Sequence, residues 1–313
     1  GVRAANGVVL VTTKKGGAGK TEFSYNGSYT FQQPSRMPEL CDPYESMTLF
    51  NEMSMNNING GSWVFSEESF EAFRNGTRRT TDWNDLIISN VAPQTQHDIS
   101  ISGGTEKTKF YISMGYFYQE GIFRSGDLNY NKFNLRSRLD VELSKIVSIG
   151  TNISMVYSKS QRPTNNFVDF MRFPQWIPVR HNQFTSELTG QPVGSYAQPA
   201  HFNTGTAIYP IGEIDPETGE PAYKKANPYN SQNHNPISVM ERSSNESQQY
   251  QMSANAYLNV KITKDLVFRT ANSITARYNT RESYRSKDAT KPGTPSEGSF
   301  LSTFNTNWTT DNT

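Results

Sequence analysis

Five long segments of this chain alternate between apolar and polar residues, and the connections between them differ sharply in length. The segments cover residues 108–119, 131–143, 147–159, 247–262 and 266–278. Residues 103–107, 144–146 and 263–265 form short connections, whereas residues 33–94, 120–130 and 160–246 form long ones. Alternation with a period of two predicts β-strands. If consecutive strands run antiparallel, all the short turns lie at one end of the sheet and all the long loops at the other.

Residues 131–143 show the alternation most clearly. The odd positions carry Phe133, Leu135, Leu139, Val141 and Leu143, and the even positions carry Lys132, Asn134, Arg136, Arg138, Asp140 and Glu142. Successive side chains of a strand point to opposite faces, so one face is apolar and the other is charged. In a transmembrane β-barrel the charged face meets the aqueous lumen, because a charge on the lipid face is destabilising. We therefore expect a lumen lined by Lys132, Arg136, Arg138, Asp140, Glu142 and Arg269.

A soluble antiparallel sheet is the alternative, because alternation alone does not distinguish lipid from a protein core on the apolar face. Strand length favours the membrane, since soluble strands usually have about 5 to 6 residues and a tilted membrane strand needs about 9 to 11. Hydrophobic residues make up 34% of the chain, below the roughly 45 to 50% of ordinary domains. No apolar run approaches the ~18 residues that a membrane-spanning helix needs. We therefore predict an all-β fold that is part of a large antiparallel transmembrane barrel.

Residues 21–32 also alternate and predict the first strand of this barrel. The long connection after them contains two helix-like stretches. One begins at Asp42 and Pro43, with Glu45 three residues after Asp42, and the other begins at Ser66, followed by two glutamates. Near the end of the sequence, Trp308 begins what we expect to be another strand.

Several stretches of the chain resemble one family of proteins. Gly1, Arg3, Ala4, Ala5, Asn6 and Gly7 fill a Gly-x-Arg-Ala-Ala-Asn-Gly motif, and the resemblance continues through residues 81–87, 97–122 and 131–145 in the same order. The chain is similar in these stretches to SusC/RagA-type TonB-dependent outer-membrane transporters. Residues 161–245 match no motif of the family, as expected of an extracellular loop that varies with cargo.

The resemblance implies a barrel of 22 strands around an internal plug domain. Residues 1–20 would be the last segment of the plug, and residues 21–313 would be the N-terminal portion of the barrel, with extracellular loops 33–94 and 160–246. The chain would then be an internal fragment of a longer protein in the outer membrane of a Gram-negative cell. The implied function is import of oligosaccharides or peptides. The implied partners are a SusD-like lipoprotein, TonB, the cargo and the lipid bilayer, with no cofactor and no nucleic acid.

One motif suggests a different function. Residues 15–21 read KGGAGKT and follow the apolar residues 8–11, as in the P-loop of partition-type ATPases. A P-loop needs a helix directly after it, because the amides at the helix N-terminus bind phosphate. Residues 22–31 alternate with a period of two instead, and Lys14 stands where the first glycine of a standard P-loop would be. A basic hinge between plug and barrel explains the glycines equally well, so we predict that the protein is not an enzyme.

Aromatic side chains in the long loop could contact cargo by stacking on sugar rings or packing against peptide side chains. The candidates are Trp176, Phe170, Tyr196 and Tyr209, with Trp176 foremost. The alternative is that such rings form a small core of the loop itself.

Other polar residues give no catalytic or metal site in the sequence. His97, His181, His201 and His234 are scattered without the i, i+4 spacing of a helical zinc site, and we expect them at the surface or in the lumen. Asp215, Glu217 and Glu220 suggest a calcium site, but an Asp-Pro-x-x-Gly sequence first predicts a turn.

Overall fold

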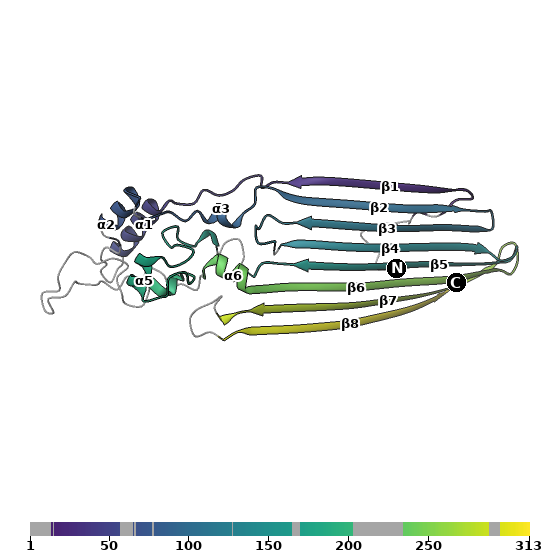
Figure 1. Cartoon of the computed structure of the whole chain (residues 1–313). Helices are drawn as coiled ribbons and strands as arrows, with labels where there is room; N and C mark the ends of the chain where they lie inside the picture. The colour runs from purple at the N-terminus through teal and green to yellow at the C-terminus, as the bar shows by residue number, and fades with distance from the viewer. Residues whose placement is uncertain are drawn as a thin grey trace.

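The chain forms one antiparallel sheet with a layer of helices and loops at one end (Figure 1). The computed structural model describes residues 14, 16–56, 65, 67–76, 78–126, 128–164, 170–202, 234–287 and 295–313. Its eight strands pair in sequence order, so that each strand neighbours the one before it. They are β1 (Gly19–Gln32), β2 (Ala92–Gly104), β3 (Thr108–Glu120), β4 (Asn129–Glu142), β5 (Val147–Gln161), β6 (Ser243–Lys261), β7 (Val267–Arg285) and β8 (Glu297–Asn312).

The predicted separation of short turns from long loops is confirmed. The three short turns lie at one end of the sheet, opposite the helices (Figure 1). Each turn is closed by a backbone hydrogen bond: Thr105 N to Thr108 O at 2.7 Å, Ser144 N to Val147 O at 3.1 Å and Thr263 N to Leu266 O at 3.2 Å. We call the other end of the sheet the loop end.

Strand lengths of 13 to 19 residues exceed what a soluble sheet usually has. The predicted strands are all present, and β2 fills the interval between the first long loop and the first turn. The predicted bounds differ from the structure most at the end of β7 and at the start of β8. β7 continues to Arg285 because its backbone pairs with β6 up to the Ser243–Arg285 pair, although its side chains there are polar. β8 begins at Glu297 and not at Trp308, because its backbone pairs with β7 as far as the Arg285–Glu297 pair.

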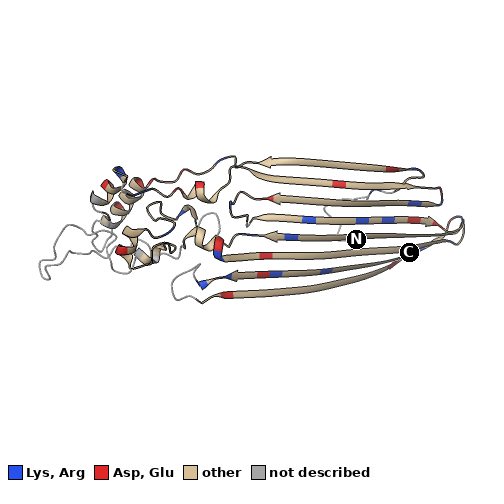
Figure 2. Cartoon of the chain, in the orientation of Figure 1, with Lys and Arg blue, Asp and Glu red and all other residues tan. Residues whose placement is uncertain are grey.

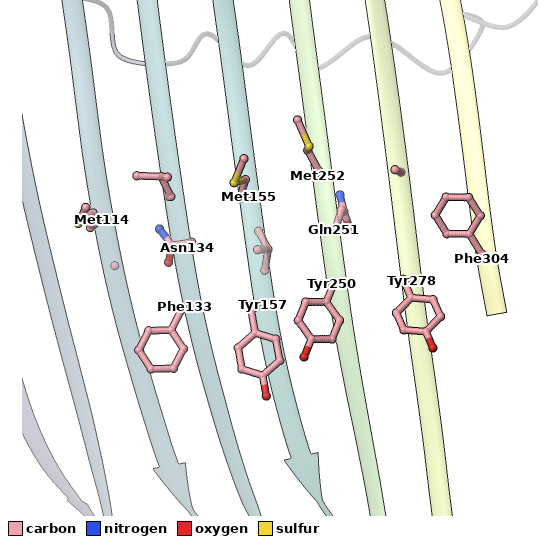
Figure 3. Close-up of a pocket in the computed structure, with 14 residues that line it drawn as sticks. Met114, Phe133, Asn134, Met155, Tyr157, Tyr250, Gln251, Met252, Tyr278 and Phe304 are labelled. Carbon is pink, nitrogen blue, oxygen red and sulfur yellow. The ribbon is translucent and has the colours of Figure 1, made fainter. Parts of the chain in front are cut away.

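The register gathers the apolar side chains on one face of the sheet, which we call the apolar face. One line of paired residues across β2 to β8 consists of His97, Tyr116, Phe133, Tyr157, Tyr250, Tyr278 and Phe304, and we call it the aromatic row. Ring centroids of neighbours from His97 to Tyr278 lie between 4.7 and 6.5 Å apart. Figure 3 shows the rings of Phe133, Tyr157, Tyr250, Tyr278 and Phe304 on neighbouring strands, together with Met114, Met155 and Met252. A shallow apolar groove of about 530 Å³ is lined by residues of the aromatic row and by these three methionines.

The apolar face is open to its surroundings in the described structure. Met114 is 58% exposed, Phe133 is 49% exposed and Phe304 is 67% exposed. An exposed apolar surface that continues across many strands marks an interaction surface rather than ordinary protein surface. This exposure is the opposite of what a soluble sheet with a protein core on that face would show.

The described residues of 33–91, 121–128 and 162–242 pack together at the loop end, and we call them the loop layer. It contains α1 (Pro43–Met55), α2 (Glu67–Arg74), α3 (Trp83–Ile87), α5 (Gln183–Thr189), η2 (Pro199–Phe202) and α6 (Pro236–Arg242). The two predicted helices are α1 and α2. Asp42 caps α1 as expected, because its Oδ1 accepts from Glu45 N at 2.7 Å and its N donates to Glu45 Oε2 at 3.1 Å.

Aromatic side chains form the core of the loop layer and tie its segments together. Phe65, Phe70, Trp83, Phe123, Phe170, Phe173 and Trp176 all belong to this core. Trp83 is fully buried, donates from Nε1 to Pro174 O at 3.0 Å and meets Phe173 edge to face, with centroids 4.8 Å apart. The loops 33–91 and 162–242 are therefore joined by packing and by a hydrogen bond. Among the helices of the described residues, none has both the length and the apolar character of a membrane-spanning helix.

Candidate functional site

The polar face of the sheet is a continuous wall of hydroxyl, amide and charged side chains. On β5 and β6 it is lined by Ser148, Asn152, Ser154, Ser158, Gln249, Ser253, Asn255 and Asn259, which pair across the two strands. The six residues expected to line a lumen all share this face. Lys132, Arg136, Arg138, Asp140 and Glu142 alternate along β4, and the register connects Glu142 to Arg269 through Ser148 and Asn259. Figure 2 shows that β4 and β7 each carry more charges than any other strand.

Towards the short-turn end, one pair of opposite charges on the polar face is neutralised within the wall. Arg138 Nε donates to Asp140 Oδ2 at 2.8 Å, and the Tyr257 hydroxyl donates to the same carboxylate. The guanidinium of Arg269 lies 4.5 Å from the centre of the Tyr257 ring. Tyr257 fits over β5 because Gly150 carries no side chain there. Arg138, Asp140, Tyr257 and Arg269 thus form one polar network on this part of the wall.

Towards the loop end, the polar face has a groove of about 370 Å³, which we call the loop-end groove. Its lining contains Tyr130, Ser158, Ser160, Arg162, Ser247, Gln248, Gln249, Asn279, Thr280, Arg281, Leu301 and Thr303. Two of these residues are arginines and none is acidic. Both arginines are exposed. The groove therefore combines a positive charge with a dense set of hydrogen-bonding groups.

Of the predicted cargo-contact residues, those that the structure describes lie in the loop layer and not along the polar wall. Phe170 is 1% exposed and Trp176 is 2% exposed, and Trp176 packs edge to face against Phe65 with centroids 5.4 Å apart. Tyr196 is 6% exposed, and its ring lies 3.9 Å from the guanidinium carbon of Arg180. These contacts favour the alternative in which the rings form the core of the loop. Tyr209 lies outside the described residues, as does the turn that contains Asp215, Glu217 and Glu220.

Two histidines are not where the sequence predicts them. His181 is 2% exposed and His201 is 8% exposed, so the expectation of surface or lumen positions is wrong for both. His181 Nε2 and His201 Nδ1 lie 2.8 Å apart, with the rings stacked at 5.1 Å. Burial lowers the pKa of His181, and burial together with the charge of His181 lowers the pKa of His201 to about 4. A separation of 20 residues within a long loop gives no sequence signal for such a contact.

The residues after the P-loop-like motif form a strand, as predicted. β1 begins at Gly19 and continues to Gln32, so no helix follows to bind phosphate. Gly16 packs so closely against the backbone of Phe110 that a side chain there would clash. The Gly-x-Arg-Ala-Ala-Asn-Gly motif lies outside the described residues, and its place in a plug remains a prediction.

Comparison with known proteins identifies relatives of one kind. The chain is 34% identical to TonB-dependent receptor P26 of Formosa agariphila over 164 residues, which are 51% of this chain and 16% of the relative. It is 31% identical to TonB-dependent receptor SusC of Bacteroides thetaiotaomicron over 134 residues, 42% of this chain and 12% of SusC. The matched regions thus span only a small part of these relatives. No family model matches the chain.

Solved structures with the same fold agree with these relatives. The RagAB peptide importer in its closed-closed state matches 100% of this chain and 34% of the solved chain, with a TM-score of 0.63 and 19% identity. In its open-open state the TM-score is 0.64 at 18% identity, with the same coverage. The long paired strands and the open apolar face are those of a barrel-type sheet. The chain is therefore similar in sequence to TonB-dependent receptors, SusC among them, and similar in fold to the RagAB peptide importer.

Proposed function

We propose that the protein takes part in TonB-dependent import of oligosaccharides or peptides across the outer membrane, together with a SusD-like surface lipoprotein. The observation that carries the proposal is the division of one sheet into two faces. The apolar face leaves Met114 58% exposed, which suits lipid, whereas the polar face is a wall of hydroxyl, amide and charged groups, which suits a hydrated passage.

We also propose the division of the chain that the family resemblance implies. Residues 1–20 form the end of an internal plug and residues 21–313 form part of the barrel. The loop layer stands outside the cell, because long loops of such barrels are extracellular and short turns are periplasmic. The likeness to RagAB, a peptide importer by name, and to SusC supports import without deciding between peptides and oligosaccharides.

Among the residues that the structure describes, the wall of the passage has no groups arranged to perform chemistry on a cargo. Its paired charges, such as Arg138 and Asp140, hold each other rather than a reacting atom. The work of import comes from TonB, and the six charged residues of the polar face contact the plug or hydrated cargo. The relatives are receptors and not enzymes, which supports this assignment.

Uptake measurements test the proposal directly. Cells that express the natural full-length receptor and its lipoprotein partner should accumulate oligosaccharides or peptides from a mixed labelled pool, and accumulation should stop when TonB is deleted. Uptake that persists without TonB, or no uptake of any pool component, would exclude the proposed function.

Topology gives a second and independent test. A cysteine at Lys145, in the turn between β4 and β5, should resist a membrane-impermeant thiol reagent on intact cells. A cysteine at Glu187, in α5 of the loop layer, should react. The reversed labelling pattern would show that the long loops face the periplasm. Each cysteine is introduced in a Cys41→Ser background, because Cys41 is exposed.

A further inference from the structure

The loop-end groove differs from the Arg138–Asp140 region of the polar wall in the balance of its charges. Arg162 follows β5, and Arg281 lies on β7. Among the described residues, neither has a carboxylate within ion-pair distance, whereas Arg138 nearer the short turns binds Asp140 at 2.8 Å. The two arginines therefore leave a net positive charge at this point of the wall.

Nearby acidic residues are placed so that they do not neutralise this charge. Glu246 lies on the opposite face of the sheet, where it pairs with Lys159 at 2.8 Å. Glu282 pairs in register with Glu246 and so shares that face. Asp98 on β2 accepts a hydrogen bond from Gln96 at 2.7 Å and is not part of the groove lining. Alternation along the strands thus separates acids and arginines that are close in sequence.

The remaining lining defines what the arginines bind. Ser158, Ser160, Ser247 and Thr303 supply hydroxyl groups, and Gln249 and Asn279 supply amides. Such groups both donate and accept hydrogen bonds, as sugar hydroxyls do. The lining has one apolar side chain, Leu301, and one aromatic ring, Tyr130. It offers a ring face for a sugar and little surface for the apolar side chains of a peptide.

We propose that the loop-end groove binds an anionic oligosaccharide, with Arg162 and Arg281 pairing with its carboxylate or sulfate groups. This inference rests on the proposed import function and names the class of cargo. The planar guanidinium matches both carboxylate and sulfate oxygens with two parallel hydrogen bonds. The hydroxyl and amide side chains hold the neutral part of the sugar. Neutral sugars lose the charge-assisted bonds and bind more weakly.

Binding to the purified full-length receptor tests the proposal, with four probes measured by calorimetry. The probes are a hexagalacturonate, its neutral methyl ester, a sulfated maltohexaose and a hexaglutamate peptide. We expect the hexagalacturonate or the sulfated sugar to bind at least about tenfold more tightly than the neutral ester. The tighter of the two identifies the source of the anionic group. The double substitution Arg162→Gln and Arg281→Gln should weaken this binding by about tenfold or more.

The matched control removes two positive charges elsewhere. Arg36→Gln with Arg79→Gln changes the net charge equally, at exposed loop positions outside the groove, and should leave binding unchanged. Electrophoretic mobility before and after heating shows whether each variant is folded. Equal binding of the neutral ester, an equal loss in both double variants, binding of the peptide alone, or no binding of any probe would overturn the proposal.

Failure of this inference is distinguishable from failure of the proposed function. TonB-dependent uptake of neutral oligosaccharides or peptides, unaffected by the Arg162 and Arg281 substitutions, would overturn the anionic cargo and leave import standing. Absence of TonB-dependent uptake for every component of the pool would overturn import, while the binding measurements on purified protein still decide the chemistry of the groove.

Discussion

Tyr257 occupies the space that any side chain on Gly150 would need. The two residues pair directly across β5 and β6 on the polar face, and a Cβ on residue 150 would overlap the outer atoms of the phenol ring. The Tyr257 hydroxyl in turn donates a hydrogen bond to the carboxylate of Asp140 on β4, and the ring contacts the guanidinium of Arg269 on β7. A glycine on one strand thus fixes a polar network that extends from β4 to β7.

Replacing Gly150 by alanine should displace Tyr257 and break its hydrogen bond to Asp140. We expect a loss of about 1 to 3 kcal/mol in the free energy of unfolding, the usual cost of losing a hydrogen bond to a charged group. Urea titration of the receptor folded in detergent micelles measures this loss in the free energy of unfolding. In a Tyr257→Ala background the space is already open, so Gly150→Ala should then cost little. Equal costs in both backgrounds would show that the two side chains are not coupled.

The two faces of β4 should report different solvents. Spin labels at Leu135, Leu139 and Val141 should be accessible to a lipid-soluble quencher, and labels at Arg136, Arg138 and Asp140 should be accessible to a water-soluble one. Leu139→Arg should cost roughly 2 to 4 kcal/mol if the residue lies near the bilayer midplane. The same accessibility on both faces would mean that β4 does not cross a membrane.

The buried pair of His181 and His201 should make the loop layer sensitive to acid. Both pKa values lie below the ordinary value of about 6.5, so the neutral rings are favoured in the folded layer, and the opened layer takes up more protons. Stability is therefore complete above about pH 6.5 and falls as the pH drops towards the pKa of about 4 of His201. Hydrogen exchange of residues 181–202, corrected for the intrinsic rate, should rise over this interval.

Substitution of both histidines by glutamine should remove this dependence on pH. The backbone bonds of the segment, such as His181 N to Ser195 O at 2.8 Å, do not require the imidazoles. If the double variant keeps the same exchange profile as the parent protein, other groups cause the acid sensitivity.

Trp83 should be essential to the loop layer and dispensable for the sheet. Trp83→Ala removes a fully buried ring and the bond to Pro174 O, and should destabilise the layer by roughly 3 to 5 kcal/mol. Limited proteolysis should then cut residues 78–91 and 170–202 faster. Leu86→Ala in the same helix is the control, because Leu86 is 41% exposed. Equal cleavage of both variants would assign the effect to the helix rather than to the buried ring.

The alternation of apolar and polar residues predicted the sheet well, because the polarity of each side chain in these strands matches the face of the sheet on which it lies. Leu139 and Arg138 are adjacent in the sequence and yet lie on opposite faces, as the pattern requires. The helices α1 and α2 were also predictable, since capping residues such as Asp42 act within a few residues of sequence. Local signals of this kind do not depend on the rest of the fold.

The contents of the loop layer depend on contacts between distant residues and were not predictable. Trp83 meets Phe173 because two long loops fold against each other, and His181 meets His201 because one long loop folds back on itself. The loop-end groove likewise combines residues from the ends of β5, β6, β7 and β8, and no single segment of sequence contains its two arginines together with its hydroxyl wall. Strand ends were missed for the related reason that ladder pairing extends strands into polar sequence, as at Arg285.

The aromatic row crosses the strands at constant register, and this has a geometric consequence in the membrane. Strands of such barrels tilt by roughly 35 to 45° from the membrane normal. A line perpendicular to them is inclined to the membrane plane by the same angle. From β2 to β8 the row crosses six strand spacings, each of about 4.8 Å, so it climbs about 16 to 20 Å through an apolar band that is about 25 Å tall. His97 and Phe304 therefore lie at different depths, each nearer to a different surface of the membrane. The rings form an oblique row on the outside of the barrel and not a row at one constant depth.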